Sequence, residues 1–337
     1  MCTPRLVKLT QPLNTLPTNV GGFYFIATVL DVKVALPAEI TKNIRLDRAD
    51  PSQVAEIYPF LDGSRILGPS GFNRTHYECE WTEISNDNPI KQNKSNPLPE
   101  SEWRYYILAF SGNGNELNDL LKVMDIIPPY ICSWAYVYTT EPFGYGSPWG
   151  YGTDPYSGPI FYTGKVHSAK TFDDTHISAL RQHLELYNNL DKEKHEGIIR
   201  ALEFNRNLKM LSPVNNLKLL AYFVIIEMLL THNPNDKEIG DSLMHQIKTK
   251  ASLLSSRLDD PIDYSIFGDV SPEKIWAALY CYRSYIAHGV HINFEDNNNL
   301  KKLKNEQTAT DFVATVTRKF LKHALHEPDL INGLKPI

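Results

Sequence analysis

An arginine and a histidine lie five positions apart near the end of one predicted helix, in the run RSYIAH that begins at Arg283 and ends at His288. A histidine can take the proton from a ribose 2′-hydroxyl that attacks the adjacent phosphorus, or give a proton to the leaving 5′ oxygen. A planar guanidinium can hold the negative charge of the phosphorane. These two side chains therefore predict cleavage of RNA without a metal ion. In an arbitrary helix the same residues would be a surface arginine and a helix cap.

The helix that carries this pair has clear sequence signals at both ends. Ser271 is a natural N-cap, Pro272 suits the first helical position, and Gly289 suits the position just past the last turn. On an ideal helix the side chains at 283 and 288 would point ~140° apart. They converge only if the helix loosens at its end, which Gly289 would allow. The apolar stripe of this helix falls at Ile275, Leu279, Tyr282 and Ile286.

Glu227 is a single acid within the apolar run AYFVIIEMLLTH. An unpaired carboxylate would be costly to bury among such neighbours, so we expect it to pair with Arg283 or with a helix end. In that position it would orient the arginine, although an ordinary structural ion pair fits the pattern equally well. Ser284 directly follows the arginine and is the second candidate for a supporting role.

The spacing of Arg283 and His288, the Ala-His-Gly ending and the aromatic helix before them resemble the HEPN superfamily of ribonucleases. The likeness is greatest to the ApeA-like branch, which is known from bacterial anti-phage defence, and it covers the second half of the chain. Where many members have Asn, Asp or His after the arginine, this chain has Ser284. The resemblance implies a helical bundle, a homodimer with a composite active site, and metal-independent RNA cleavage in defence or as a toxin.

Two other interpretations remain open for the same half of the chain. It would be a non-catalytic HEPN-like module that binds RNA or a partner protein, or a dimerisation scaffold for a ligand sensor. The basic run of Lys301, Lys302 and Lys304 would contact RNA phosphates, or form a solvated loop. His291 would assist His288, bind a metal together with it, or be a loop histidine.

Composition narrows the class of protein. The chain has 337 residues, enough for two domains, and its net charge of −5 argues against a broad basic surface, so any RNA contact must be local. The four cysteines are scattered without a CxxC pair, which predicts a cytoplasmic protein with no zinc site and no cofactor. The run of residues 217–230 is interrupted by Lys218 and Glu227, so it predicts a buried helix and no membrane contact.

The two halves differ in their residue patterns, strand-like in the first and helical in the second, which predicts an α+β protein. Residues 1–165 suggest a mixed, strand-rich sensor or regulatory domain, where a phage-derived or small-molecule trigger would bind. Its predicted strands are residues 23–34, 103–110 and 131–139, and its short helices are residues 51–60 and 116–124. Residues 85–100 are polar and predict an exposed loop. The aromatic stretch 143–162 would stack bases, bind a protein trigger or pack internally.

Residues 166–337 show helical periodicity throughout and predict an all-α HEPN-like nuclease domain. The helix that starts after Ser212 at Pro213 is apolar nearly all round, so we expect it to be the central helix. The predicted helices are residues 173–189, 192–210, 213–231, 237–258, 272–288 and 309–325.

Overall fold

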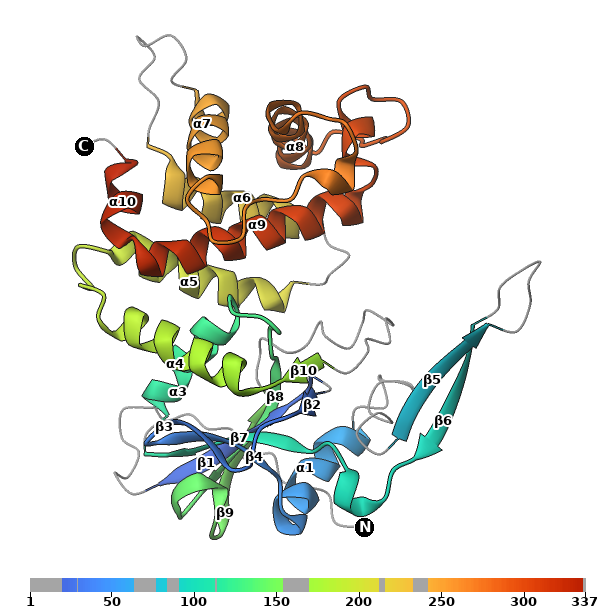
Figure 1. Ribbon diagram of the computed structural model, residues 1–337, viewed down its shortest axis with the longest axis vertical. Helices are drawn as coiled ribbons and strands as arrows, with labels where there is room; N and C mark the ends of the chain where they lie inside the picture. Colours follow the sequence, from blue (N-terminus) through green and yellow to red (C-terminus); the bar gives the residue numbers. More distant parts are fainter. Residues whose placement is uncertain are drawn as a thin grey trace.

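The computed structural model describes residues 20–28, 30–63, 77–83, 91–112, 114–153, 170–211, 216–232 and 242–335. An antiparallel sheet occupies the N-terminal half of the chain, and most of the helices lie in the C-terminal half, which confirms the mixed fold class (Figure 1). The predicted boundary between residues 165 and 166 lies outside the described residues.

The main sheet has six antiparallel strands in the order β3-β4-β7-β1-β8-β9. In chain order these strands are β1 (Gly21–Ile26), β3 (Ala38–Thr41), β4 (Ile44–Arg48), β7 (Tyr106–Ser111), β8 (Ser133–Thr139) and β9 (Pro148–Thr153). Strand β1 lies at the centre, where Phe23 is opposite Ala109 of β7 and Val137 of β8. Both faces of the sheet are covered, because alternate residues of β1 and β7 belong to two different buried clusters.

Helix α1 (Pro51–Gly63) covers one face of the sheet, where Ile57 packs with Phe23 and Phe25. Helices α3 (Asn115–Met124) and α4 (Asp174–Asn188) lie against the other face and separate the sheet from the remaining helices (Figure 1). The predicted helices at 51–60 and 116–124 are therefore confirmed. Asp173 caps α4, since its side chain accepts hydrogen bonds from the backbone of Thr175 and His176.

Several expectations for the first half need correction. The predicted strand 23–34 is two strands: β1 ends at Ile26, and β2 (Leu30–Val32) pairs in parallel with β10 (Lys170–Phe172). The predicted loop 85–100 contains a strand, β6 (Lys91–Pro97), which forms a projecting hairpin with β5 (Tyr77–Glu83) (Figure 1). Pairing with β5 satisfies the backbone of this polar segment, and local composition does not reveal such a partner.

Strands β3, β4, β5 and β9 also lie outside the predicted strand segments. The aromatic stretch that begins at residue 143 enters β9, which is an edge strand of the main sheet. Trp149 stacks on Tyr138, while Tyr145 and Tyr151 are exposed; residues 154–162 lie outside the described part. The 3-10 turns are η2 (Glu100–Glu102) and η3 (Pro142–Gly144).

The second half is mostly helical, as the periodicity predicts, but it is not all-α, because it contains strand β10, which pairs with β2 of the first half. After β10 and α4 its elements are α5 (Glu196–Asn207), η5 (Leu208–Met210), α6 (Leu217–Leu230), α7 (Leu243–Ser255), η6 (Ser265–Phe267), α8 (Pro272–Ala287), η7 (Leu300–Leu303), α9 (Glu306–His326) and α10 (Pro328–Gly333). Helix α6 contacts α5, α7, α8, α9 and α10, so it is the central helix, as its uniformly apolar sequence predicts. None of the described helices has the length and the apolar run that a membrane crossing needs.

Most differences in the second half concern where helices begin. The starts predicted at Pro213 and at residue 237 lie outside the described residues. The described helix α7 follows an N-cap at Ser242, whose hydroxyl accepts a hydrogen bond from the backbone of His245 at 3.3 Å. Helix α5 begins four residues later than predicted, and α9 begins three residues earlier.

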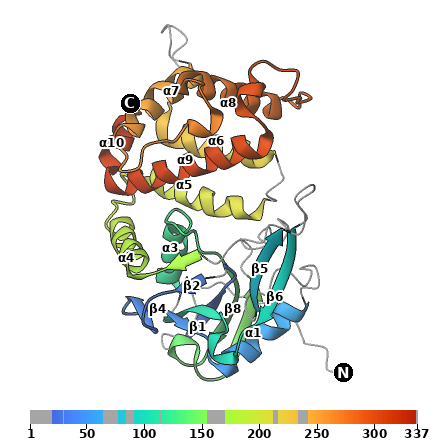
Figure 2. The ribbon, with the colours of Figure 1, turned by 45° about the vertical axis from the view of Figure 1, so that its right-hand side comes forward.

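The buried core is continuous across the two halves. The larger cluster of buried side chains runs from Leu108 on β7, through Leu184 on α4, to Phe320 on α9. In the turned view α4 lies between the sheet and the upper helices (Figure 2). The sheet and the helical bundle are therefore packed against one another through α4 and its neighbours.

Candidate functional site

An ion pair joins the central helix α6 to α8 at the predicted site. The Nη2 atom of Arg283 lies 3.3 Å from Oε1 of Glu227 and donates a hydrogen bond of 3.4 Å to Oε2. Of the two partners predicted for Glu227, the structure therefore selects Arg283. The contact holds the guanidinium against α6 and limits the directions in which it can face.

The helical periodicity of both elements explains why these two side chains meet. Phe223 and Glu227 are four residues apart, so they share one face of α6. Tyr280 and Arg283 are three residues apart on α8. The ring of Phe223 meets that of Tyr280 edge-to-face at 6.4 Å, and the Arg283 guanidinium lies 5.7 Å from the Tyr280 ring centre. The i, i+3 spacing of Tyr280 and Arg283 was visible in the sequence, but the role of Tyr280 was missed.

The pair is partly shielded from solvent. The exposed fraction is 23% for the Arg283 side chain and 18% for that of Glu227. Burial raises the pKa of Glu227 above its usual value, although the charge of Arg283 and its hydrogen bond act in the opposite direction. Among the described residues, neither Oε1 of Glu227 nor Nε of Arg283 has a hydrogen-bond partner. The guanidinium is thus anchored through one amino group, and its other N–H groups can still donate hydrogen bonds to a ligand.

His288 lies at the exposed end of α8, directly after its last helical residue. The helix ends as predicted: Gly289 has φ 65°, and its N–H donates to the Ile286 carbonyl at 3.2 Å. The N–H of Val290 donates to the Tyr285 carbonyl at 2.9 Å, which completes a Schellman motif. The imidazole is therefore carried at a well-formed helix terminus and is open to solvent.

The helix by itself does not bring Arg283 and His288 together. The N–H of His288 donates to the Ser284 carbonyl at 3.0 Å, so α-helical bonding continues to the end. The side chains at 283 and 288 consequently leave the helix ~140° apart. The loosening that would let them converge within one chain does not occur before His288. Ser284 is half-buried next to Arg283.

The basic run lies beside this helix end. The loop after His288 folds back, because Asn297 donates a hydrogen bond to the Tyr285 hydroxyl at 3.0 Å, and η7 then packs along α8. Lys301 and Lys304 are exposed, whereas Lys302 is half-buried and donates to Asn299 at 2.9 Å. Of the three lysines predicted to contact phosphates, Lys301 and Lys304 therefore have ammonium groups that are open to solvent.

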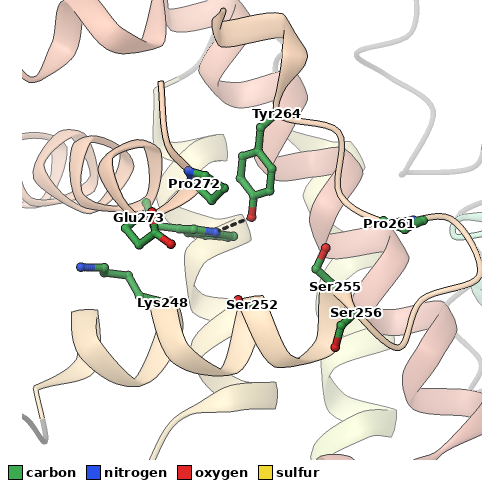
Figure 3. A pocket seen from close by; sticks show the side chains of 9 residues that line it. Lys248, Ser252, Ser255, Ser256, Pro261, Tyr264, Pro272 and Glu273 are labelled. Atoms are coloured by element: carbon green, nitrogen blue, oxygen red, sulfur yellow. Dashed lines mark hydrogen bonds between the residues drawn. The ribbon is translucent and has the colours of Figure 1, made fainter. Parts of the chain in front are cut away.

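A separate pocket lies at the opposite end of α8, about 24 Å from His288 along a helix of this length (Figure 3). It measures about 290 Å³, and Trp276 forms part of its wall with its indole N–H donating to the Tyr264 hydroxyl at 2.8 Å. Its other lining residues are Lys248, Ser252, Ser255, Ser256, Pro261, Pro272 and Glu273. Neither Arg283 nor His288 lines this pocket.

Within the described ranges, no group of three or more His, Cys, Asp and Glu side chains is placed to hold a metal ion. The chemistry on hand at the end of α8 is thus that of a guanidinium anchored by a carboxylate, an exposed imidazole, and exposed ammonium groups from the neighbouring turn. No family model, curated protein or solved structure matches the chain.

Proposed function

We propose that the chain is a metal-independent endoribonuclease that works as a homodimer. Arg283 would hold the negative charge of the phosphorane, and His288 would transfer protons. The observation that carries this proposal is the Arg283–Glu227 ion pair on the helix that ends in an exposed His288. The Glu227 carboxylate restricts the motion of the Arg283 guanidinium before RNA binds. Less of that motion then has to be lost when the guanidinium contacts a phosphate.

The reaction requires two proton transfers. One imidazole would take the proton of the ribose 2′-hydroxyl as its oxygen bonds to phosphorus. A second would give a proton to the 5′ oxygen as the bond from phosphorus to that oxygen breaks. The products are a 2′,3′-cyclic phosphate and a 5′-hydroxyl. Because one chain has a single His288 and carries it ~140° from Arg283, the complete set of groups needs two copies of α8 in contact.

Purified chain should cleave total RNA in the presence of EDTA, and the fragments should carry 2′,3′-cyclic phosphate ends. His288→Ala should lower the cleavage rate by at least about 100-fold, because a general acid–base group typically contributes that much. The variant should keep its helix content and its oligomeric state. These are measured by circular dichroism and by light scattering.

His291→Ala is the matched control, since His291 is an exposed histidine three residues further along the chain. It should cleave at the wild-type rate. Equal cleavage by the His288→Ala protein would remove the nuclease proposal, as would cleavage that EDTA abolishes.

A second function is favoured by the divergence of the two side chains within one chain. A HEPN-like module without catalysis would bind RNA or a partner protein, with Arg283 serving α6–α8 packing. In that case wild-type protein would retain RNA without cutting it, and His288→Ala would bind as wild type does. The role in bacterial anti-phage defence, or as a toxin, rests on the HEPN resemblance. If it holds, expression of the wild-type chain should slow growth and expression of the His288→Ala chain should not.

A further inference from the structure

Five basic residues lie near one short loop, residues 125–132, which connects α3 to β8. Four of them contact the loop, and Lys218 interacts electrostatically with Cys132 at its end. They come from elements far apart in the chain. The five are Lys170 on β10, Arg206 on α5, Lys209 in η5, Lys218 on α6 and Arg318 on α9. We call this group the junction cluster, since the loop belongs to the first half of the chain and the five cations belong to the second half.

The contacts of the loop are specific. Lys209 and Arg206 both bind the buried Asp125, the latter at 3.5 Å from its Nη1 atom to Oδ2. The ammonium group of Lys170 donates to the Pro129 carbonyl at 2.7 Å. The Arg318 guanidinium lies 4.4 Å from the centre of the Tyr130 ring. The loop is thus held by cations on several sides.

Positive charge exceeds negative charge in this cluster. Asp125 balances part of the charge of Arg206 and Lys209. No described carboxylate forms an ion pair with Lys170, Lys218 or Arg318, and the buried Nε of Arg318 has no hydrogen-bond partner among the described residues. Asp311 is exposed and acts on Lys218 only through its longer-range field.

The cations also act on one another. Burial lowers the pKa of Lys170 and that of Lys218, and the charges of Arg318 and Lys209 act in the same direction. Cys132 opposes this shift at both lysines, and Asp311 opposes it at Lys218. Like charges at partly buried positions repel more strongly than they would in water. A polyvalent anion would remove this repulsion. Its oxygen atoms would also accept hydrogen bonds from donors that lack a described partner.

We propose that the junction cluster binds a small polyphosphate-bearing anion, of the kind carried by a nucleoside triphosphate, through Lys170, Lys218 and Arg318. Three basic side chains that form no ion pair with a described carboxylate match a ligand with several negative charges. Arg is suited to bidentate phosphate contacts, and Lys supplies point charges. The three side chains are half-buried, so a small ligand would reach them more easily than a nucleic-acid duplex would. A bound anion would contact β10 as well as two helices of the bundle, α6 and α9.

Isothermal titration calorimetry of the full chain tests this site with inorganic tripolyphosphate and with ATP, at low ionic strength. Both should bind. Lys218→Met and Arg318→Gln should each weaken both affinities by at least about tenfold, the value of one charge-assisted hydrogen bond. Without ligand, the melting temperature of Lys218→Met should equal or exceed that of wild type, because one unpaired cation has been removed.

Lys192→Met is the matched control, since Lys192 is exposed and lies in the turn before α5. It should bind both probes as wild type does. The proposal is overturned if neither probe binds, if Lys218→Met and Arg318→Gln bind as tightly as wild type, or if ATP binds and tripolyphosphate does not. It is also overturned if these variants lose only the binding of an RNA oligonucleotide. Since binding is measured, the outcome is independent of whether the chain cleaves RNA.

Discussion

At the scale of single residues, the geometry of Arg283 depends on Glu227. The carboxylate contacts the guanidinium at 3.3 Å, yet burial raises its own pKa. The attraction of Arg283 therefore does not fully offset the cost of removing the carboxylate from water. A residue that carries such a cost while ordering an arginine fits the proposed positioning role, because stability alone would favour an apolar side chain.

The raised pKa gives a pH-dependent prediction for Glu227→Gln. The folded chain holds the proton of Glu227 more tightly than the unfolded chain does. The group's contribution to stability is therefore complete below the unfolded pKa of 4.5 and is lost as pH rises through the folded value. Glutamine does not titrate. Measured by urea unfolding, the variant should become more stable relative to wild type as pH rises above 4.5.

Glu273→Gln, on the same helix as Arg283, should show the opposite trend. Hydrogen bonding to the backbone and to Ser271 lowers the pKa of Glu273. Its contribution is therefore present above the unfolded pKa and lost as pH falls through the folded value. If both variants changed in the same direction with pH, burial would not be the cause of the Glu227 shift. In the RNA assay, Glu227→Gln should reduce cleavage if Glu227 orients Arg283.

At the scale of elements, the end of α8 determines where His288 points. Gly289 adopts φ 65°, a left-handed conformation that costs other residues roughly 1–2 kcal/mol. A Cβ at Gly289 would meet nothing within 4 Å, so the strain would come from the backbone alone. Gly289→Ala should therefore lower the free energy of unfolding by about 1 kcal/mol, and Gly289→Asn by less, as urea titration would measure.

Gly333→Ala provides the comparison for this element. A Cβ at Gly333 would likewise meet nothing within 4 Å, but this glycine lies in α10 and not at a left-handed position. Alanine there should leave stability unchanged or raise it by up to about 1 kcal/mol. A loss equal to that of Gly289→Ala would show that the backbone angle at Gly289 is not what the substitution disturbs.

At the scale of the whole molecule, the shared core joins the sheet to the bundle through α4. Leu184 is 2% exposed and belongs to the cluster that extends from β7 to α9. Leu184→Ala should cost about 2–5 kcal/mol. Because the core is continuous, amide hydrogen exchange should become faster in both β4 and α9.

Ile57→Ala tests the smaller cluster, which lies between α1 and the other face of the sheet. Its effect on local exchange should be greatest in α1 and the adjacent strands. If Leu184→Ala increased exchange in the helical half only, the two halves would be energetically separate despite their shared packing.

The sequence alone determined the features that depend on local periodicity and on terminal residues. The uniformly apolar run of α6 predicted the central helix, and Gly289 predicted the end of α8, because burial and backbone freedom are encoded residue by residue. The apolar neighbours of Glu227 likewise predict a partner for it, because an unpaired carboxylate is costly to bury. Its pairing with Arg283 follows from the packing of α6 on α8, which spacing within either helix did not specify.

Tertiary structure decided what depends on partners distant in the chain. Strand β6 is polar and forms through pairing with β5, β2 pairs with β10 across about 140 residues, and the junction cluster joins cations from five elements. Each of these features is stabilised by contacts between segments that are distant in the chain, and the local sequence of one segment does not indicate its partner. The direction of His288 relative to Arg283 likewise follows from α-helical bonding that continues to the last turn.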